Sequence, residues 1–304
     1  MKKVIVAGAT GSLGMEIVKA LLEKGAEVTA MVRATSNRSK LESLGVKNFV
    51  IGDMMDPVSL KNALTKDKIF DAIVASAAGY TQHSKGDSSL TDTVGYRNLV
   101  DATKAAGIPR FVLISILECN NATAVPHFYN KHLIEKYLTE KKQPFIALRP
   151  GVFLDQTPDF IMPKITKGIF PVFFPDVNYG IIYTPDLARY IAIAATSLPD
   201  TELNTTIDLG WDKPVNGDLL ATAFGKVLNK SIKTEPVFPS FFLKIVAPIL
   251  GKFNHRMYDL IQMLKWVKTG AYISKNTQRQ KELFGDLPTI EEAVARYCKD
   301  RKLI

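Results

Sequence analysis

The amino-acid sequence predicts an α/β fold, with a doubly wound parallel sheet and a smaller, mainly helical C-terminal lobe. Short apolar strands alternate with amphipathic helices from the start to roughly residue 150. The first strand runs into a glycine-rich turn that opens a helix, and beyond Pro150 the alternation becomes irregular. We therefore expect a nucleotide-binding domain over residues 1–155, to which a late strand near 205–210 returns, and a substrate or lid lobe over 156–304.

The strands of the first half are continuous runs of apolar, often β-branched residues. Such runs are typical of strands that are buried on both faces of a parallel sheet. We predict strands at 3–8, 27–32, 47–51, 70–76, 110–115 and 144–148. Between them, apolar residues recur at helical spacing and predict helices at 12–24, 36–44, 57–65, 88–106 and 126–141. Ligands of such sheets bind at the carboxyl ends of the strands.

The second half predicts a looser arrangement. Residues 170–175 read Phe-Pro-Val-Phe-Phe-Pro and predict an aromatic loop interrupted by proline. A helix at 185–197, a strand at 206–209 and a helix at 218–228 follow. An apolar helical pair over 238–268 is too short and too interrupted to span a bilayer. It predicts packed lobe helices, with a lid or a membrane-surface helix as alternatives.

Bulk composition narrows the class of protein. The net charge is +9, but the basic residues are spread along the chain, which favours a solvated basic surface over a nucleic-acid partner. Two cysteines, Cys119 and Cys298, lie far apart and no export signal is recognised, so we expect reduced thiols and a cytoplasmic location. We expect a monomer or a homodimer, and a small molecule as the main partner.

The glycine turn is the most specific local signal. Gly8 permits a tight turn after the first strand, Gly11 lets backbone approach a phosphate, and Gly14 lets the helix pack closely on the strand. The free N–H groups of the first helical turn then face the anion. The predicted pyrophosphate site consists of the turn residues Gly8, Thr10, Gly11, Ser12, Leu13 and Gly14.

Further blocks of sequence follow at fixed places. They are Met31-Val32-Arg33, the stretches 52–60, 98–108 and 110–115, Leu148-Arg149-Pro150-Gly151, and 184–188. Together with the glycine turn, these blocks resemble the NmrA-like group of atypical short-chain dehydrogenase/reductases, within the NAD(P)-binding Rossmann superfamily. The resemblance covers roughly residues 1–210. It implies a Rossmann fold and a nicotinamide cofactor, and it says little about the C-terminal lobe.

Two arginines bear on the choice of cofactor. Chains of this class that prefer NAD carry an acidic residue at the end of the second strand, where it binds the ribose 2′-hydroxyl. Here Arg33 stands at that place, with Arg38 five residues on. A guanidinium can donate two hydrogen bonds to a 2′-phosphate, so we predict NADP(H) in preference to NAD(H). An exposed helix charge is the alternative for Arg38.

The resemblance implies further cofactor contacts. Asp53, followed by Met54, would meet the adenine, although an acid in a turn or at a helix start is the alternative for Asp53. Small residues after the fourth strand, Ala77 among them, would let the ribose and the pyrophosphate lie against backbone; close packing is their alternative. Ser115, at the end of the fifth strand, and Lys131 complete the candidate cofactor residues.

In this chain, the candidate catalytic residues depart from the usual pattern of the group that it resembles. That pattern is a serine with Tyr-x-x-x-Lys on one helix, where the lysine lowers the pKa of the tyrosine. Lys131 fits the lysine, but His127 stands at the tyrosine position and Tyr129 lies two residues before the lysine. The serine is expected at Leu117 or Glu118, after Ser115 and Ile116, and neither of these two residues carries a hydroxyl. The candidates are Lys131 for the ribose and His127 or Tyr129 as proton donor; for His127 a surface histidine is the alternative.

Two functions from different classes follow. The first is an NADP(H)-dependent oxidoreductase that transfers hydride to a small apolar acceptor, such as a quinone or an enone. The second is a non-catalytic NADP(H)-binding redox sensor or assembly protein, as the resemblance also implies. The loss of the tyrosine disfavours a nucleotide-sugar epimerase. We predict no metal site.

Overall fold

The computed structural model describes residues 1–65, 69–79, 89–155, 164–237, 249 and 251–304. The chain divides into two compact units, each assembled from separate stretches. Unit 1 consists of Met1–Asn120, Pro126–Arg149 and Pro185–Ile207. Unit 2 consists of Asn121–Val125, Pro150–Thr184 and Asp208–Ile304. The chain therefore passes between the units several times.

Unit 1 is built on a seven-stranded sheet with the order β10-β6-β5-β4-β1-β2-β3. The strands are β1 (Lys3–Ala7), β2 (Glu27–Val32), β3 (Asn48–Ile51), β4 (Ala72–Ala75), β5 (Phe111–Ile114), β6 (Phe145–Pro150) and β10 (Thr205–Leu209). All pairs from β3 to β6 are parallel. The order reverses between β1 and β4, and such a switch point is where open α/β sheets bind their ligands.

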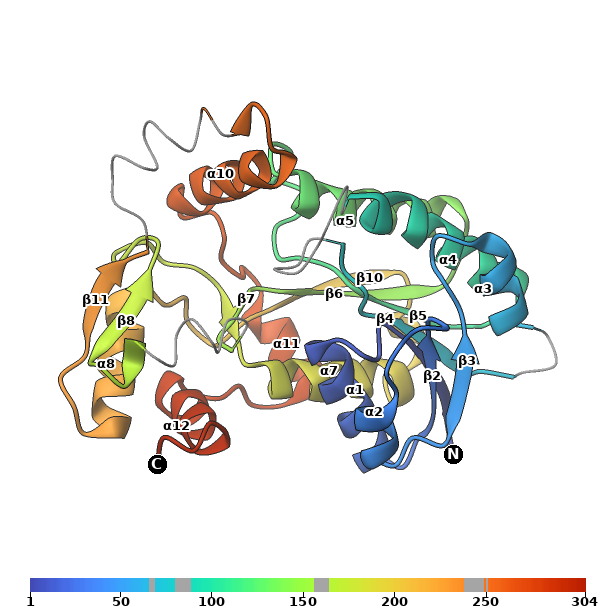
Figure 1. The fold of residues 1–304 in the computed structure, drawn as a ribbon, viewed down its shortest axis with the longest axis horizontal. Coiled ribbons are helices and arrows are strands. Elements are labelled where there is room, and N and C mark those ends of the chain that lie inside the picture. Colours follow the sequence, from blue (N-terminus) through green and yellow to red (C-terminus); the bar gives the residue numbers. More distant parts are fainter. Residues whose placement is uncertain (66–68, 80–88, 156–163, 238–248, 250) are drawn as a thin grey trace. The chain divides into compact units, whose positions relative to one another are not determined.

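Helices cover both faces of this sheet. They are α1 (Ser12–Glu23), α2 (Ser39–Ser43), α3 (Pro57–Ala63), α4 (Tyr96–Ala105), α5 (Pro126–Glu140) and α7 (Thr184–Thr196). Figure 1 shows α3, α4 and α5 on one face, and α1 and α7 on the other. The predicted doubly wound α/β fold is confirmed, and the predicted elements of this half agree with the structure to within a few residues at most ends.

One predicted helix differs in a way that matters for the site. The stretch 88–106 was expected to be a single α-helix, but Thr91–Gly95 forms a π-helical turn, η1, before α4 begins at Tyr96. A π turn holds one more residue than an α turn and is frequent at functional sites. A single such turn leaves no periodic signal in the sequence.

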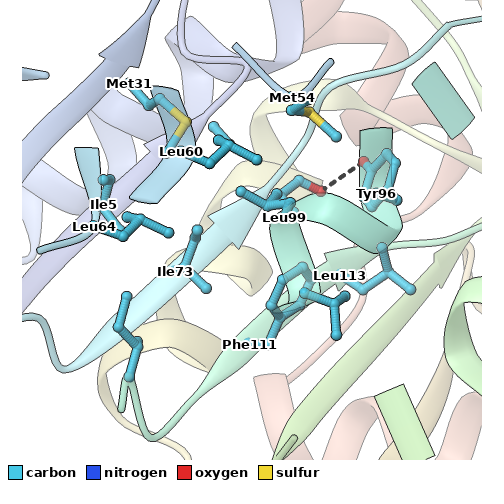
Figure 2. Close-up of a cluster of buried hydrophobic side chains, with 14 of the residues drawn as sticks. Ile5, Met31, Met54, Leu60, Leu64, Ile73, Tyr96, Leu99, Phe111 and Leu113 are labelled. Carbon is cyan, nitrogen blue, oxygen red and sulfur yellow. Dashed lines mark hydrogen bonds between the residues drawn. The ribbon is translucent and has the colours of Figure 1, made fainter. Parts of the chain in front are cut away.

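The core of unit 1 lies between the sheet and the helices of one face (Figure 2). Ile5 and Ile73 from neighbouring strands, Phe111 from β5 and Leu99 from α4 are all 0% exposed. Each side chain of this size stabilises the fold by about 1.5–3 kcal/mol when it leaves water. Tyr96 belongs to the same cluster, but its hydroxyl reaches the carboxyl end of β4. This face of the sheet is therefore closely packed up to the edge where a ligand would lie.

Unit 2 combines helices with two small parallel strand pairs. Its elements are β7 (Val152–Phe153), β8 (Ile169–Val172), β9 (Ile181–Ile182), β11 (Lys233–Pro236), α8 (Gly217–Leu228), α10 (His255–Lys268), α11 (Thr277–Phe284) and α12 (Ile290–Asp300). β7 pairs with β9, and β8 with β11. The core of this unit contains Phe170, which stacks on Phe224 with ring centroids 5.5 Å apart.

The strand β8 corrects one prediction. Residues 170–175 were expected to be a loop, but Phe170 to Val172 are strand residues. Phe170 is 4% exposed, so it packs in the core of its unit. Of the predicted apolar pair over 238–268, residues 238–248 and 250 lie outside the described residues, and α10 accounts for the second helix. Within the described part of the chain, no helix has the length and apolar character that crossing a membrane requires.

Candidate functional site

The glycine turn lies at the switch point of the sheet. Gly8 follows β1 and has a φ of +88°, a conformation that glycine adopts without strain. A Cβ on Gly8 would lie 2.6 Å from the backbone nitrogen of Ala77, which follows β4. The two chain segments therefore approach each other closely through their backbones, and the Ser76 hydroxyl donates to the Ala7 carbonyl at 3.1 Å. This close approach brings two predicted cofactor residues, Gly8 and Ala77, together.

The turn leaves the start of α1 open. Gly11 is the N-cap residue, and it has no side chain that could satisfy the N–H groups of the first turn. Thr10, Gly11 and Ser12 are exposed, and Leu13 is half-buried. Gly14 is buried, and a Cβ there would lie 2.0 Å from the carbonyl oxygen of Gly8. The helix start thus presents backbone donors and a positive dipole end, an arrangement that suits a phosphate.

A pocket of about 380 Å³ lies beside this turn. Its lining residues are Thr10, Met15, Arg33, Ser36, Asn37, Lys40 and Leu41. The backbone N–H of Arg33 donates to the Ser36 hydroxyl at 3.1 Å, which closes the turn after β2. Arg33 and Lys40 are exposed cations, and no carboxylate is among these lining residues. The pocket is therefore suited to an anionic group next to the pyrophosphate site.

Arg38 lies elsewhere. Its guanidinium carbon sits 5.4 Å from the centroid of the Phe49 ring, a cation–π contact with β3, and Arg38 is not among the lining residues of the pocket. The second cation that lines the pocket, beside Arg33, is Lys40. Lys40 was not among the predicted site residues, although its position seven residues after Arg33, on a predicted helix next to the strand end, was a usable signal.

The predicted adenine residues form a turn and a core contact. Oδ1 of Asp53 accepts a hydrogen bond from the Met55 backbone at 2.9 Å. The following acid, Asp56, caps α3 through the N–H groups of Val58 and Ser59. Met54 is 9% exposed and packs in the unit 1 core. The turn-forming alternative for Asp53 therefore describes its contacts in this structure.

Lys131, on α5, lies in a buried charged cluster. Its ammonium is 2.8 Å from Oδ1 of Asp92 and 3.9 Å from the centroid of the Tyr96 ring. Lys131 is 5% exposed and Asp92 2%. Burial lowers the pKa of Lys131, but Asp92 and then Tyr96 act the other way, and the net pKa lies above its usual range. The cluster therefore favours the charged form of Lys131.

The same cluster holds the chain that leaves β4. Oδ2 of Asp92 accepts a hydrogen bond from the Gly79 backbone at 2.9 Å. The Tyr96 hydroxyl donates to the Ala77 carbonyl at 2.5 Å, and Lys131 Nζ lies 3.5 Å from the same oxygen. Three side chains from η1, α4 and α5 thus fix the segment from Ala77 to Gly79 at the switch point.

Ser115 belongs to a second buried cluster, at the ends of β5 and β6. Its hydroxyl donates to Oε1 of Glu135 at 2.7 Å. Nε of Arg149 donates to the same oxygen at 2.8 Å, and Arg149 also bonds the second oxygen of Glu135 and the side chain of Asn120. The only proton of Ser115 is therefore committed to Glu135, which leaves none for a ligand carbonyl.

His127 and Tyr129 lie on the first turn of α5. Both are half-buried. His127 contacts Phe128 edge-to-face, with ring centroids 4.6 Å apart. Tyr129 lies 5.7 Å from the ring of His132, which in turn is 3.4 Å from Glu135. Helical spacing puts His127 on the side of Lys131, one turn earlier, whereas Tyr129 shares a side with His132.

One group of potential metal ligands occurs in the described residues. Ligand atoms of Cys119, His132 and Glu135 lie within 4.8 Å of one another. Both oxygens of Glu135 are bound by the Arg149 guanidinium, and a second cation there would be repelled. Burial, together with the charge of Glu135, raises the pKa of Cys119 to about 12. Cys119 is thus a protonated, free thiol with its place in the core.

Comparisons with known proteins agree with the geometry. A model of the NmrA-like family matches residues 1–294. The chain belongs to the NmrA-like family. The resemblance of the sequence to this family is therefore confirmed, and the match extends beyond residue 210 into the C-terminal part.

Among curated relatives, the chain is 32% identical over 215 residues to the Photosystem II assembly factor Ycf39 of Guillardia theta. The match covers 70% of this chain and 66% of that protein. For the Ycf39 of Cyanophora paradoxa the corresponding shares are 62% and 57%, at 28% identity. The chain thus matches less than two thirds of the length of these relatives.

Two solved structures share the fold. One is the NADPH-dependent quinone oxidoreductase QOR2 of Escherichia coli, complexed with NADPH, with a TM-score of 0.75 and 18% identity over 97% of this chain and 99% of that chain. The other is a triphenylmethane reductase of Citrobacter sp., complexed with NADP(H), with a TM-score of 0.76 and 21% identity over 96% of this chain and 99% of that one. At this identity, the likeness shows the Rossmann fold.

Proposed function

We propose that this NmrA-like protein binds NADP(H) at the switch point of unit 1 and transfers hydride to a small apolar acceptor. The observation that carries the cofactor choice is the pocket beside the glycine turn. It is lined by Arg33 and Lys40 and by no carboxylate, and two cations suit a 2′-phosphate better than a ribose hydroxyl. Two proteins of the same fold are described as complexes with NADPH and NADP(H), which supports the proposal.

The residues near the β4 and β5 ends favour a particular class of acceptor. Asp92 favours the charged form of Lys131, and the Ser115 hydroxyl donates its proton to Glu135, so neither is suited to give a proton to the reduced substrate. A quinone accepts hydride to form a hydroquinone anion, which is stable enough to take its proton from water. His127 and Tyr129 remain the candidate proton donors for an acceptor that needs one. We therefore favour quinones over simple aldehydes.

The cofactor proposal predicts a preference that fluorescence titration can measure. Arg33→Ala should weaken NADPH binding by about 10- to 100-fold, the loss of a charge-assisted pair, and leave NADH binding almost unchanged. Lys40→Ala should act in the same direction and less strongly. Lys47→Ala, an exposed lysine at the amino end of β3, is the matched control and should change neither affinity. Equal wild-type affinities for NADPH and NADH would contradict the preference.

A second candidate function is a non-catalytic, NADP(H)-binding assembly or sensor protein. It is favoured by the commitment of both Lys131 and Ser115 to buried carboxylates, and by relatives that are named as assembly factors. NADPH consumption against quinones, enones and aldehydes separates the two functions. Turnover with quinones supports the first. Tight NADPH binding with no turnover on any acceptor supports the second.

A further inference from the structure

Asp92 links the lysine of α5 to the exit of β4. One carboxylate oxygen lies 2.8 Å from the Lys131 ammonium, and the other accepts from the Gly79 backbone at 2.9 Å. Asp92 can do both because the π turn η1 directs it inward, where it is 2% exposed. A buried carboxylate is costly unless its partners are charged or donate hydrogen bonds, and this one has both kinds.

The charge balance around Lys131 depends on this carboxylate. Among the described residues, the ionisable groups that influence the ammonium are Asp92 on η1 and Tyr96 on α4. Glu135, one turn further along α5, is engaged with Arg149. Burial also keeps Tyr96 protonated by raising its pKa, against the pull of Lys131. Asp92 is therefore the anion that keeps Lys131 charged while buried.

We propose that Asp92 is a positioning residue, which fixes both the Lys131 ammonium and the Ala77–Gly79 segment against which the nicotinamide half of the cofactor binds. The inference rests on the proposed NADP(H) site. By holding Lys131, the carboxylate orients the ammonium that would bind the nicotinamide ribose. By accepting from Gly79, it fixes the path of the backbone at the switch point. Asp92, which lies outside the sequence blocks that resemble the family, thus positions two parts of the site.

The substitution Asp92→Asn separates the two effects. The amide oxygen still accepts from Gly79, but the charge facing Lys131 is gone. We expect NADPH affinity to fall about tenfold at pH 7, the loss of one charge-assisted contact. We also expect the affinity to fall further as the pH rises toward 9.5, because Lys131, buried without its counter-ion, deprotonates more easily. Wild-type affinity should stay level over this range as far as Lys131 is concerned.

A double-mutant cycle distinguishes positioning from general support of the fold. If Asp92 acts through Lys131, Asp92→Asn should have almost no further effect on affinity in a Lys131→Met background. Asp101→Asn is the matched control, because Asp101 is an exposed α4 carboxylate paired with Lys141 at 3.0 Å. Its NADPH affinity and pH profile should equal those of the wild type.

The outcomes are separable. A wild type that does not bind NADPH overturns the proposed function itself. A wild type that binds, with an Asp92→Asn variant of equal and pH-independent affinity, overturns the role of Asp92 alone. If Asp92→Asn does not fold, the neutral pair Asp92→Asn/Lys131→Met supplies the test. That double variant should fold, since no charge is left buried, and should bind NADPH as weakly as Lys131→Met; wild-type affinity in it would refute the inference.

Discussion

At the scale of single residues, Gly14 is the most constrained position of the glycine turn. A Cβ there would lie 2.0 Å from the Gly8 carbonyl oxygen and 2.9 Å from Ala9 backbone atoms, none of which can move aside as a side-chain tip can. Gly14→Ala should therefore displace α1 from β1. We expect NADPH affinity to fall at least about tenfold and unfolding to become easier by about 1–3 kcal/mol, as for other overpacked cores.

The control for this substitution is Gly25→Ala, at the end of α1. Nothing lies within 4 Å of a Cβ on Gly25, whose φ of +74° makes the change mildly strained. Gly25→Ala should lower stability by about 1 kcal/mol and leave NADPH affinity unchanged. Urea unfolding and fluorescence titration measure both effects. Full NADPH affinity in Gly14→Ala would show that the turn is not the pyrophosphate site.

Residue identity alone was enough to predict Gly8 and Gly14 as turn residues and Arg33 as a cation beside the turn, because glycine backbone freedom and fixed charge are local properties. It could not reveal Asp92, whereas Lys40 was overlooked although its place on the predicted helix after Arg33 was a usable signal. Asp92 matters because the chain folds it against Lys131, 39 positions further along, and no local rule connects these two residues. For Arg38 the charge was visible but the direction of the side chain was not, since Phe49 on the neighbouring strand decides it.

At the scale of elements, α5, β5 and β6 are joined by the buried Glu135 cluster. Glu135→Gln would remove the carboxylate that pairs with the Arg149 guanidinium, whose side chain is 12% exposed. Breaking a buried pair in this way typically costs about 3–5 kcal/mol. We expect that loss in urea unfolding, and a partial recovery in Glu135→Gln/Arg149→Met. The exposed pair broken by Asp101→Asn should cost about 0–1 kcal/mol. A Glu135→Gln variant as stable as wild type would show that the cluster contributes little.

Most elements were predictable from hydrophobic period and turn residues, as the six strands of the first half show. The strand β8 was not. Its partner β11 begins about 60 residues later along the chain, and Pro171 within it argues against a strand. A two-stranded edge pair tolerates that proline, because one side of the strand needs no backbone donor. The pairing of β8 with β11 depends on tertiary structure, so the local sequence pattern does not reveal it.

At the scale of the whole molecule, unit 1 recruits a distant stretch of the chain. Residues Pro185–Ile207 belong to it, although they follow the predicted boundary near residue 155. In this stretch Leu187, Tyr190 and Ile191 are at most 1% exposed. Arg110, next to β5, donates to the Ala194 carbonyl at 2.9 Å. The first 155 residues therefore lack two parts of this unit. One is the helix α7, which covers one face of the sheet, and the other is the edge strand β10.

A pair of fragments tests this dependence. Fragment 1–155 would expose the surface that α7 covers, and three large apolar side chains at about 1.5–3 kcal/mol each amount to much of the 5–15 kcal/mol that holds a typical domain together. We expect fragment 1–155 to unfold in urea without a cooperative transition and to lack the near-ultraviolet circular dichroism signal of ordered tertiary structure. Fragment 1–210, which restores α7 and β10, should unfold cooperatively and bind NADPH measurably. A cooperative 1–155 fragment with the NADPH affinity of the full chain would show instead that the nucleotide-binding half folds without the returning stretch, and that the boundary near 155 is a true domain limit.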